Sequence, residues 1–262
     1  MMLPYTGITG FMNQAEVSAV LKAMPQDSYR MVMIGVLASS ETIEGISNSR
    51  DHRYPKPHHF GSIFQSHPHA INLIHFNTKK REFLFDQMMR TRELGGEYCH
   101  GFQLNVPWPG TNVLMQVLGE MPKSTIIVLQ VGARAFELIG HSPQKLADKI
   151  ESEYGGLIHY VLLDASGGLG KPLDARMLTP YLRALAAKRL PIGLCVAGGL
   201  SADTLHLVVS LIDEFPNLCL DAEGKLRNKK DNLNVRAAIA YIARAHVLFH
   251  NRSQENKNAR GV

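Results

Sequence analysis

The amino-acid sequence predicts one α/β domain, a closed (β/α)8 barrel of eight parallel strands with helices between them. Three observations predict this fold. A short apolar run followed by apolar residues at helical spacing recurs along the whole chain. The chain has 262 residues, a length that one barrel domain commonly reaches. No change in composition divides the repeating units, and an open doubly wound sheet, the alternative fold, would not require the eighth unit.

Apolar runs define the expected strands, and apolar residues at intervals of three and four define the expected helices. Residues 30–38 form a nearly continuous apolar run, which is typical of a parallel strand covered on both faces. The expected strands are residues 3–6, 30–38, 70–77, 102–106, 125–131, 158–164, 191–196 and 217–221. The expected helices are residues 13–24, 80–94, 111–118, 143–154, 175–188, 202–213 and 233–248. We therefore expect a barrel over residues 1–250 and a polar, frayed tail over residues 251–262.

One connection is much longer than the others. Residues 39–67 follow the second strand and are rich in Ser, Asn, Pro and His. Because a connection of this length inside a compact domain is usually functional, we expect either a lid over the site or a mobile surface loop. As a lid, it would bring Arg50 or Arg53 to an acidic group of a ligand, since the planar guanidinium suits a carboxylate or a phosphate.

Composition argues against several functional classes. No apolar run approaches the roughly 18 residues of a membrane span, and the first residues lack the basic and apolar regions of a signal peptide. The net charge of +5 is not arranged as a basic stripe with aromatic residues, so we expect no nucleic-acid partner. Cys99, Cys195 and Cys219 have no metal-ligand spacing. We expect a cytoplasmic protein with no membrane partner, and assembly into a homo-oligomer remains open.

A run of histidines is the main candidate for a metal site: His52, His58, His59, His67 and His69. His67 and His69 precede the third strand, so we expect them at the amino end of the barrel. A metal-dependent barrel would instead place an inward His-x-His pair at the carboxyl end of a strand. We therefore expect no metal and no other cofactor.

Glycine and aspartate occur together at three consecutive strand ends. Gly198 and Gly199 end the seventh strand, and Ser201 is expected to cap the helix that follows. Asp164 ends the sixth strand and leads into a glycine-rich segment that closes with Lys171. The eighth strand ends in Asp221, Ala222, Glu223 and Gly224. Glycine backbones and helix N-termini bind anions, so this pattern predicts a phosphate site; the alternative is that the glycines serve only tight turns.

Side chains alternate along a strand, which predicts those that point into the barrel mouth. They are Thr6, His75 or Asn77, Gln103, Asn105, Gln130, Asp164 and Asp221. A ring of amides and carboxylates is unlike an apolar barrel core. The mouth is therefore expected to bind a polar small molecule.

Several of these motifs resemble those of phosphoribosylanthranilate isomerases, which are TIM barrels. Thr6-Gly-Ile-Thr9 resembles the Cys-Gly-Ile-Thr of their first strand, Gln103-Leu104 the Gln-Leu of their fourth, and Arg53-Tyr54 the Arg-Tyr after their second. Residues 162–174 are similar to their Leu-Leu-Asp and Gly-Gly-x-Gly-Lys-x-x-Asp segment, and residues 197–200 match their Ala-Gly-Gly-Leu. Residues 220–224, followed by Lys230-Asp231, look like a shortened form of their last motif.

The resemblance implies an Amadori rearrangement, which converts an aminoaldose phosphate into an aminoketose. It implies that Asp164 is the acid that opens the sugar ring, and it gives Thr6 the place of the cysteine that takes the proton. A hydroxyl group does not ionise near neutral pH, so we expect a different base, such as His75 or Asp221, and little phosphoribosylanthranilate isomerase activity. Glu223 stands where the family has a serine, and its charge would repel a phosphate unless it points away.

Three functions remain open from the sequence. The first is a phosphoribosylanthranilate isomerase-like protein that binds a phosphorylated sugar or a similar small anion, with altered chemistry. The second is a lyase or hydrolase that acts on a phosphorylated metabolite beneath residues 39–67. The third is a non-catalytic barrel that binds a phosphorylated ligand or serves as an oligomeric scaffold. Phosphate-site glycines without the usual base are compatible with all three.

Overall fold

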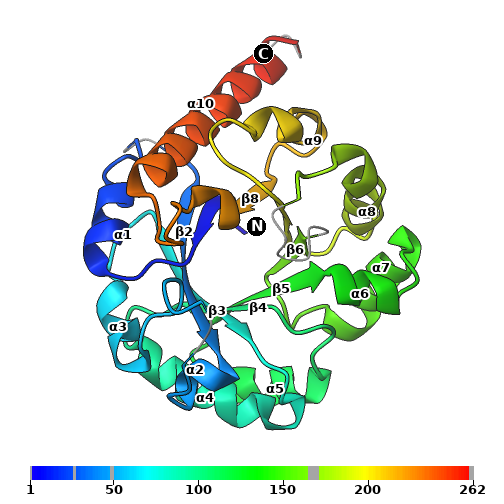
Figure 1. Cartoon of the computed structure of the whole chain (residues 1–262). Coiled ribbons are helices and arrows are strands. Elements are labelled where there is room, and N and C mark those ends of the chain that lie inside the picture. Colours follow the sequence, from blue (N-terminus) through cyan, green and yellow to red (C-terminus); the bar gives the residue numbers. More distant parts are fainter. Residues whose placement is uncertain (1, 26–27, 48–49, 165–170, 260–262) are drawn as a thin grey trace.

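The protein is a closed barrel of eight parallel strands, as predicted. The computed structural model describes residues 2–25, 28–47, 50–164 and 171–259 (Figure 1). Neighbouring strands pair in the order of the sequence, and the last strand closes on the first. The strands are β1 Tyr5–Thr9, β2 Met31–Ser39, β3 Ala70–Asn77, β4 Gly101–Leu104, β5 Ile126–Gly132, β6 Tyr160–Asp164, β7 Gly193–Ala197 and β8 Cys219–Ala222.

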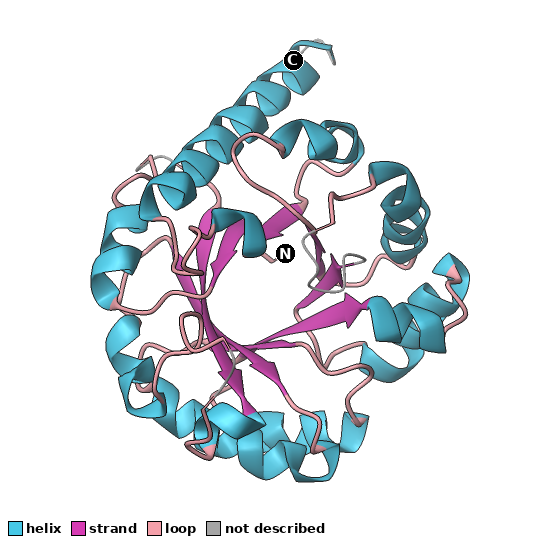
Figure 2. Cartoon of the chain, in the orientation of Figure 1, coloured by secondary structure: helices cyan, strands magenta, loops and turns pink. Residues whose placement is uncertain are grey.

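Helices surround the strands on the outside of the barrel (Figure 2). They are α1 Gln14–Leu21, α2 Ser40–Ile43, α3 Phe60–Ile63, α4 Leu84–Gly95, α5 Thr111–Glu120, α6 Ala133–Leu138, α7 Pro143–Lys149, α8 Ala175–Ala187, α9 Val209–Glu214 and α10 Val235–Ala259. In α8, the Asp174 carboxylate caps the first turn, and Leu178, Leu182 and Leu185 form the buried face. Within the described ranges, no helix combines the length and apolar character needed to cross a lipid bilayer.

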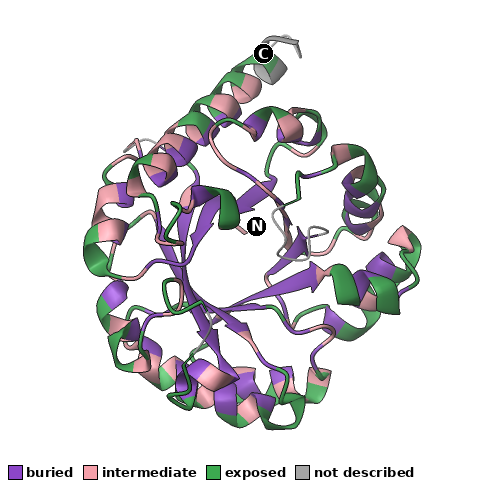
Figure 3. Cartoon of the chain, in the orientation of Figure 1, coloured by how far each residue is buried: buried purple, intermediate pink, exposed green. Residues whose placement is uncertain are grey.

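Strand side chains alternate between two apolar layers, and the strands are mostly buried, with half-buried residues at several strand ends (Figure 3). Tyr5 and Met33 belong to the inner layer, whereas Ile8 and Ile34 belong to the layer between strands and helices. Inside the barrel, the rings of Tyr5 and Tyr160 meet edge to face with centroids 5.1 Å apart. These apolar side chains fill the lower barrel, so polar chemistry is restricted to its carboxyl end.

A buried arginine joins elements at the amino end of the barrel. Arg30 Nη2 donates hydrogen bonds to the carbonyl oxygens of Tyr5 and Leu218, at 3.0 and 2.6 Å. Its guanidinium group lies 3.5 Å from the ring centroid of Phe249 on α10. Burial lowers the pKa of Arg30. This residue therefore links β1, the segment before β8, and the last helix.

Several boundaries differ from the sequence-based predictions, among them those of β1, α9 and α10. β1 occupies Tyr5–Thr9 rather than residues 3–6, because its hydrogen-bonded register with β2 continues to Thr9 and Gly35. The helix expected at 202–213 begins later, with a 3₁₀ turn at Leu205–Val208 followed by α9. α10 continues to Ala259, so the described part of the expected frayed tail is helical and extends away from the barrel (Figure 1).

Candidate functional site

A cavity of about 400 Å³ lies at the carboxyl ends of the strands. This volume is within the range of small-molecule sites. The predicted residues that line it are Arg53, His75, Gln103, Asn105, Gln130, Asp164, Gly198, Gly199, Asp221, Ala222, Glu223 and Gly224. Arg50 and Asn77, predicted as alternatives to Arg53 and His75, also line it, as does Tyr54. Arg50, Arg53 and Tyr54 all follow β2, so this segment forms part of the wall.

Thr6 does not point into this cavity, which corrects the sequence-based prediction. Because β1 runs to Thr9, alternation turns Tyr5, Gly7 and Thr9 inward and Thr6 outward. A side chain at Gly7 would meet Asp221 Oδ1 at 3.0 Å, which confirms the inward face of this strand. The Thr9 hydroxyl contacts Asp221 Oδ1 at 3.4 Å, so on this strand Thr9 rather than Thr6 reaches the carboxylate, although Thr9 is buried and does not itself line the cavity.

Ser201 and Lys171 also lie outside the residues that line the cavity. The Ser201 backbone N–H donates to Thr204 Oγ1 at 2.8 Å within a turn, so Ser201 does not cap the helix as predicted. Lys171 is exposed. The glycine-rich segment before it, residues 165–170, lies outside the described residues.

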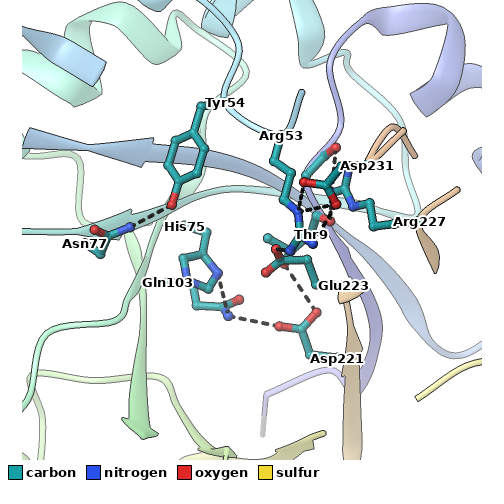
Figure 4. A network of polar contacts seen from close by, with 11 residues as sticks. Thr9, Arg53, Tyr54, His75, Asn77, Gln103, Asp221, Glu223, Arg227 and Asp231 are labelled. Carbon is teal, nitrogen blue, oxygen red and sulfur yellow. Dashed lines mark hydrogen bonds and ion pairs between the residues drawn. The ribbon is translucent and has the colours of Figure 1, made fainter. Parts of the chain in front are cut away.

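Gln103 connects the polar side chains on the cavity floor (Figure 4). Its Nε2 lies 2.9 Å from Asp221 Oδ2, 3.1 Å from His75 Nδ1 and 3.2 Å from Gln130 Oε1. Gln130 Nε2 in turn donates to Asp164 Oδ2 at 3.0 Å. The two amides therefore connect the carboxylates of β6 and β8 across the barrel.

Burial shifts the protonation equilibria of two floor residues. Loss of hydration raises the pKa of Asp221 to about 7, and the nearby charges of Glu223 and Asp164 add to the effect. Burial lowers the pKa of His75 below its usual value, so this ring is neutral at pH 7. Asp221 can therefore exchange a proton near neutral pH, while His75 accepts or donates a hydrogen bond without charge.

The segment after β2 is bound to the rest of the mouth by charged and polar contacts (Figure 4). Arg53 Nη1 lies 2.6 Å from Glu223 Oε1, and its Nε and Nη2 contact the Asp231 carboxylate at 2.7–2.8 Å. Asn77 Nδ2 donates to the Tyr54 hydroxyl at 3.1 Å. These contacts hold Arg53 and Tyr54 against the ends of β8 and β3.

Sequence reasoning missed two arginines near the mouth. Arg134 lines the cavity directly after β5 and contacts Glu137 on the same helix at 2.8 Å. Arg227 is mostly buried, and its Nη2 donates to the carbonyl oxygens of Thr9 and Gly10 at 2.8 and 3.0 Å. The position of Arg134 after a strand was a usable signal, whereas the turn that buries Arg227 left no pattern in the sequence.

The histidine run does not reach the cavity. Among the described residues, no group of three or more His, Cys, Asp or Glu side chains is placed to hold a metal ion. His67 and His69 lie just before β3, at the amino end of the barrel. His58 and His59 lie in a 3₁₀ turn on the segment after β2 and do not line the cavity.

Comparison with known proteins identifies the fold. No protein-family model matches the chain, and no curated protein matches its sequence. The phosphoribosylanthranilate isomerase of Thermus thermophilus superimposes with a TM-score of 0.63 at 15% identity, over 93% of this chain and 99% of that one. The structure of a phosphoribosylanthranilate isomerase in complex with reduced 1-(o-carboxyphenylamino)-1-deoxyribulose 5-phosphate gives a TM-score of 0.58 at 15% identity over the full length of both chains. A rubisco-like protein from Alicyclobacillus acidocaldarius gives 0.57 at 13% identity, over 99% of this chain and 66% of that one. The chain is therefore a phosphoribosylanthranilate isomerase-like TIM barrel in fold.

Proposed function

We propose that this chain is an acid–base enzyme of the isomerase type that acts on a phosphorylated sugar or a similar phosphorylated small molecule. One observation supports this function above the others. Asp164 and Asp221, residues that are 8% and 5% exposed, line one cavity and are connected through Gln103 and Gln130. Two carboxyl groups in different environments can serve as the general acid and the general base that move a proton within a substrate.

The two carboxyl groups have different proposed roles. Asp221 takes the proton from carbon, because a pKa near 7 matches a general base to neutral pH. Asp164 gives a proton to the sugar oxygen, in keeping with the resemblance of its strand to the family's acid. His75 is neutral and contacts the same amide as Asp221, so it orients the floor rather than titrating.

The ends of β7 and β8 are the proposed phosphate site. Gly198 and Gly199 have φ angles of 134° and 55°, conformations that favour glycine and let the backbone approach a ligand. Gly224, which follows β8, lines the same cavity. One similar structure, a phosphoribosylanthranilate isomerase, contains a 5-phosphate ligand, which is consistent with a phosphorylated ligand here.

Proton abstraction can be tested without knowing the product. A panel of aldose and ketose phosphates is incubated with the protein in D₂O, and exchange of the C–H next to the carbonyl is followed by NMR. We expect exchange with a phosphorylated sugar and not with the same sugar lacking phosphate. Asp164→Asn should abolish turnover to product, whereas Asp203→Asn, which changes a surface carboxylate paired with Arg244, should leave it unchanged. Absence of both exchange and binding across the panel contradicts the proposal.

A non-catalytic barrel that binds a phosphorylated ligand is the second candidate. The inward residues of β1 favour this candidate. They are Tyr5, Gly7 and Thr9, and none of them has a side chain that ionises near neutral pH. The same experiment separates the candidates. Binding of a sugar phosphate without any C–H exchange supports the second candidate and contradicts the first.

A further inference from the structure

The Arg53 guanidinium group is held by two carboxylates that lie in different places. Asp231 contacts its Nε and Nη2 edge at 2.7–2.8 Å, a two-pronged arrangement that is strong and directional. Glu223 contacts Nη1 at 2.6 Å. Glu223 and Arg53 line the cavity, whereas Asp231 does not. Asp231 thus holds the outer edge of the guanidinium, and Glu223 covers the edge that faces the ligand space.

Further positive charge lies beside this cluster. Arg227 is close enough to Glu223, Asp231 and Arg53 for their charges to influence its pKa, which burial lowers. Its Nε and Nη1 atoms are buried and find no hydrogen-bond partner within the described part of the chain. Unpaired buried donors are unfavourable, but Arg227 does not line the cavity, so it adds positive charge to this region rather than a direct contact for a ligand.

We propose that Glu223 occupies, in the ligand-free protein, the position on Arg53 that a dianionic phosphate monoester takes when it binds. The ligand phosphate replaces the Glu223 carboxylate at Nη1, and Asp231 keeps Arg53 in place during the exchange. This inference rests on the proposed function and names the ligand class that the mouth selects. It also gives a role to the carboxylate whose presence beside a phosphate site is otherwise unfavourable.

The exchange explains how the mouth would discriminate between anions. A phosphate diester or a carboxylate has one negative charge, as Glu223 has, so replacing Glu223 with it gains little electrostatic energy. A phosphate monoester is close to doubly charged above its second pKa of about 6 and presents three acceptor oxygens. Compared with the Glu223 carboxylate, it therefore attracts the Arg53 guanidinium more strongly and can accept more hydrogen bonds. Glu223 therefore lowers the affinity for every anion and excludes the singly charged ones.

Calorimetric titration tests this displacement. The probes are ribose 5-phosphate, which is dianionic at pH 8, and its methyl phosphodiester, which is monoanionic. The variant is Glu223→Gln, which keeps the shape of the side chain and removes its charge. Glu214→Gln is the matched control, because Glu214 pairs with Arg183 at 2.6 Å but does not line the cavity. Thermal melting of all three proteins checks that each one folds.

We expect Glu223→Gln to bind ribose 5-phosphate about tenfold more tightly than the unaltered protein, the scale of one partly buried ion pair that no longer has to be broken. We also expect it to gain measurable affinity for the diester, while Glu214→Gln behaves like the unaltered protein. Equal or weaker binding of ribose 5-phosphate by folded Glu223→Gln overturns the displacement and leaves the proposed function standing. No binding of either probe by any of the proteins overturns the displacement, and the absence of exchange and binding across the panel of sugar phosphates overturns the proposed function as well.

Discussion

At the scale of single residues, Gln103 places one amide nitrogen within 3.2 Å of three polar side chains. That nitrogen has only two hydrogens, so His75, Gln130 and Asp221 compete for them. When Asp221 gains a proton, its oxygen loses most of its strength as an acceptor, and the hydrogens are left for the other two groups. The protonation state of Asp221 is therefore coupled to the orientation of the whole cavity floor.

Gly199 provides a prediction at the same scale. Its φ of 55° is one that a β-branched residue adopts only with strain, about 1–3 kcal/mol. Gly199→Val should weaken ribose 5-phosphate binding at least tenfold, because the side chain also enters the proposed phosphate site. Gly140→Val is the control, since Gly140 has a φ of 63°, open space around it and no place in the cavity. If both variants fold and bind equally well in calorimetry, the phosphate site lies elsewhere.

At the scale of elements, small shifts in boundaries decided which of the predicted side chains line the cavity. Most inward residues on β3 to β8 were found from alternation, because the predicted ends of these strands lie within two residues of the observed ends. On β1, the strand was placed two to three residues too early, so Thr6 was assigned to the mouth and Thr9 was not. After β7, a 3₁₀ turn that depends on Thr204 contacts replaced the expected helix start at Ser201.

Two histidines accept hydrogen bonds from the backbone of neighbouring strands, so we expect stability to depend on pH. His100 Nδ1 accepts the Asn72 backbone N–H at 2.9 Å, and His159 Nδ1 accepts the Ile127 N–H at 3.1 Å. Burial lowers the pKa of both rings. In the unfolded chain, a histidine has a pKa of about 6.5, so below this pH the unfolded state binds more protons than the folded state. The free energy of unfolding is therefore highest above pH 6.5 and falls as the pH drops through the lowered pKa values of the folded state.

Urea unfolding at pH 7.5 and pH 5.0 measures this loss. Each protonated ring removes one backbone hydrogen bond, which contributes at most about 1 kcal/mol and less at His100, whose side chain is exposed to solvent. The double variant His100→Gln, His159→Gln should lose less stability between the two pH values, because an amide oxygen accepts the same N–H without titrating. Asp221 acts in the opposite direction, because its raised pKa favours the folded state at low pH. Its effect is present in the unaltered protein and in the double variant, so it does not affect the comparison. An equal or larger loss in the double variant contradicts this assignment.

At the scale of the whole molecule, the closed barrel was predictable because eight apolar runs alternate with helical segments. The position of the cavity followed from the topology, since parallel strands bring their carboxyl ends together. Contacts between residues far apart in the chain were not predictable. Arg53 and Asp231 are 178 positions apart, and Arg30 reaches Leu218 over 188 positions. No local pattern specifies such pairs, because they depend on how the closed barrel arranges its connections.

The central claim is that a carboxylate on β8, rather than the hydroxyl on β1, takes the proton from the substrate. Its most direct test is the rate of C–H exchange in D₂O with the best sugar phosphate, measured for Asp221→Asn and Thr6→Val. Asp221→Asn removes the proposed base from the cavity, and Thr6→Val is nearly isosteric in the outer layer. We predict a loss of roughly 10²–10⁴-fold for Asp221→Asn and a change of less than about twofold for Thr6→Val. Full exchange by folded Asp221→Asn, or a comparable loss in Thr6→Val, would contradict the claim.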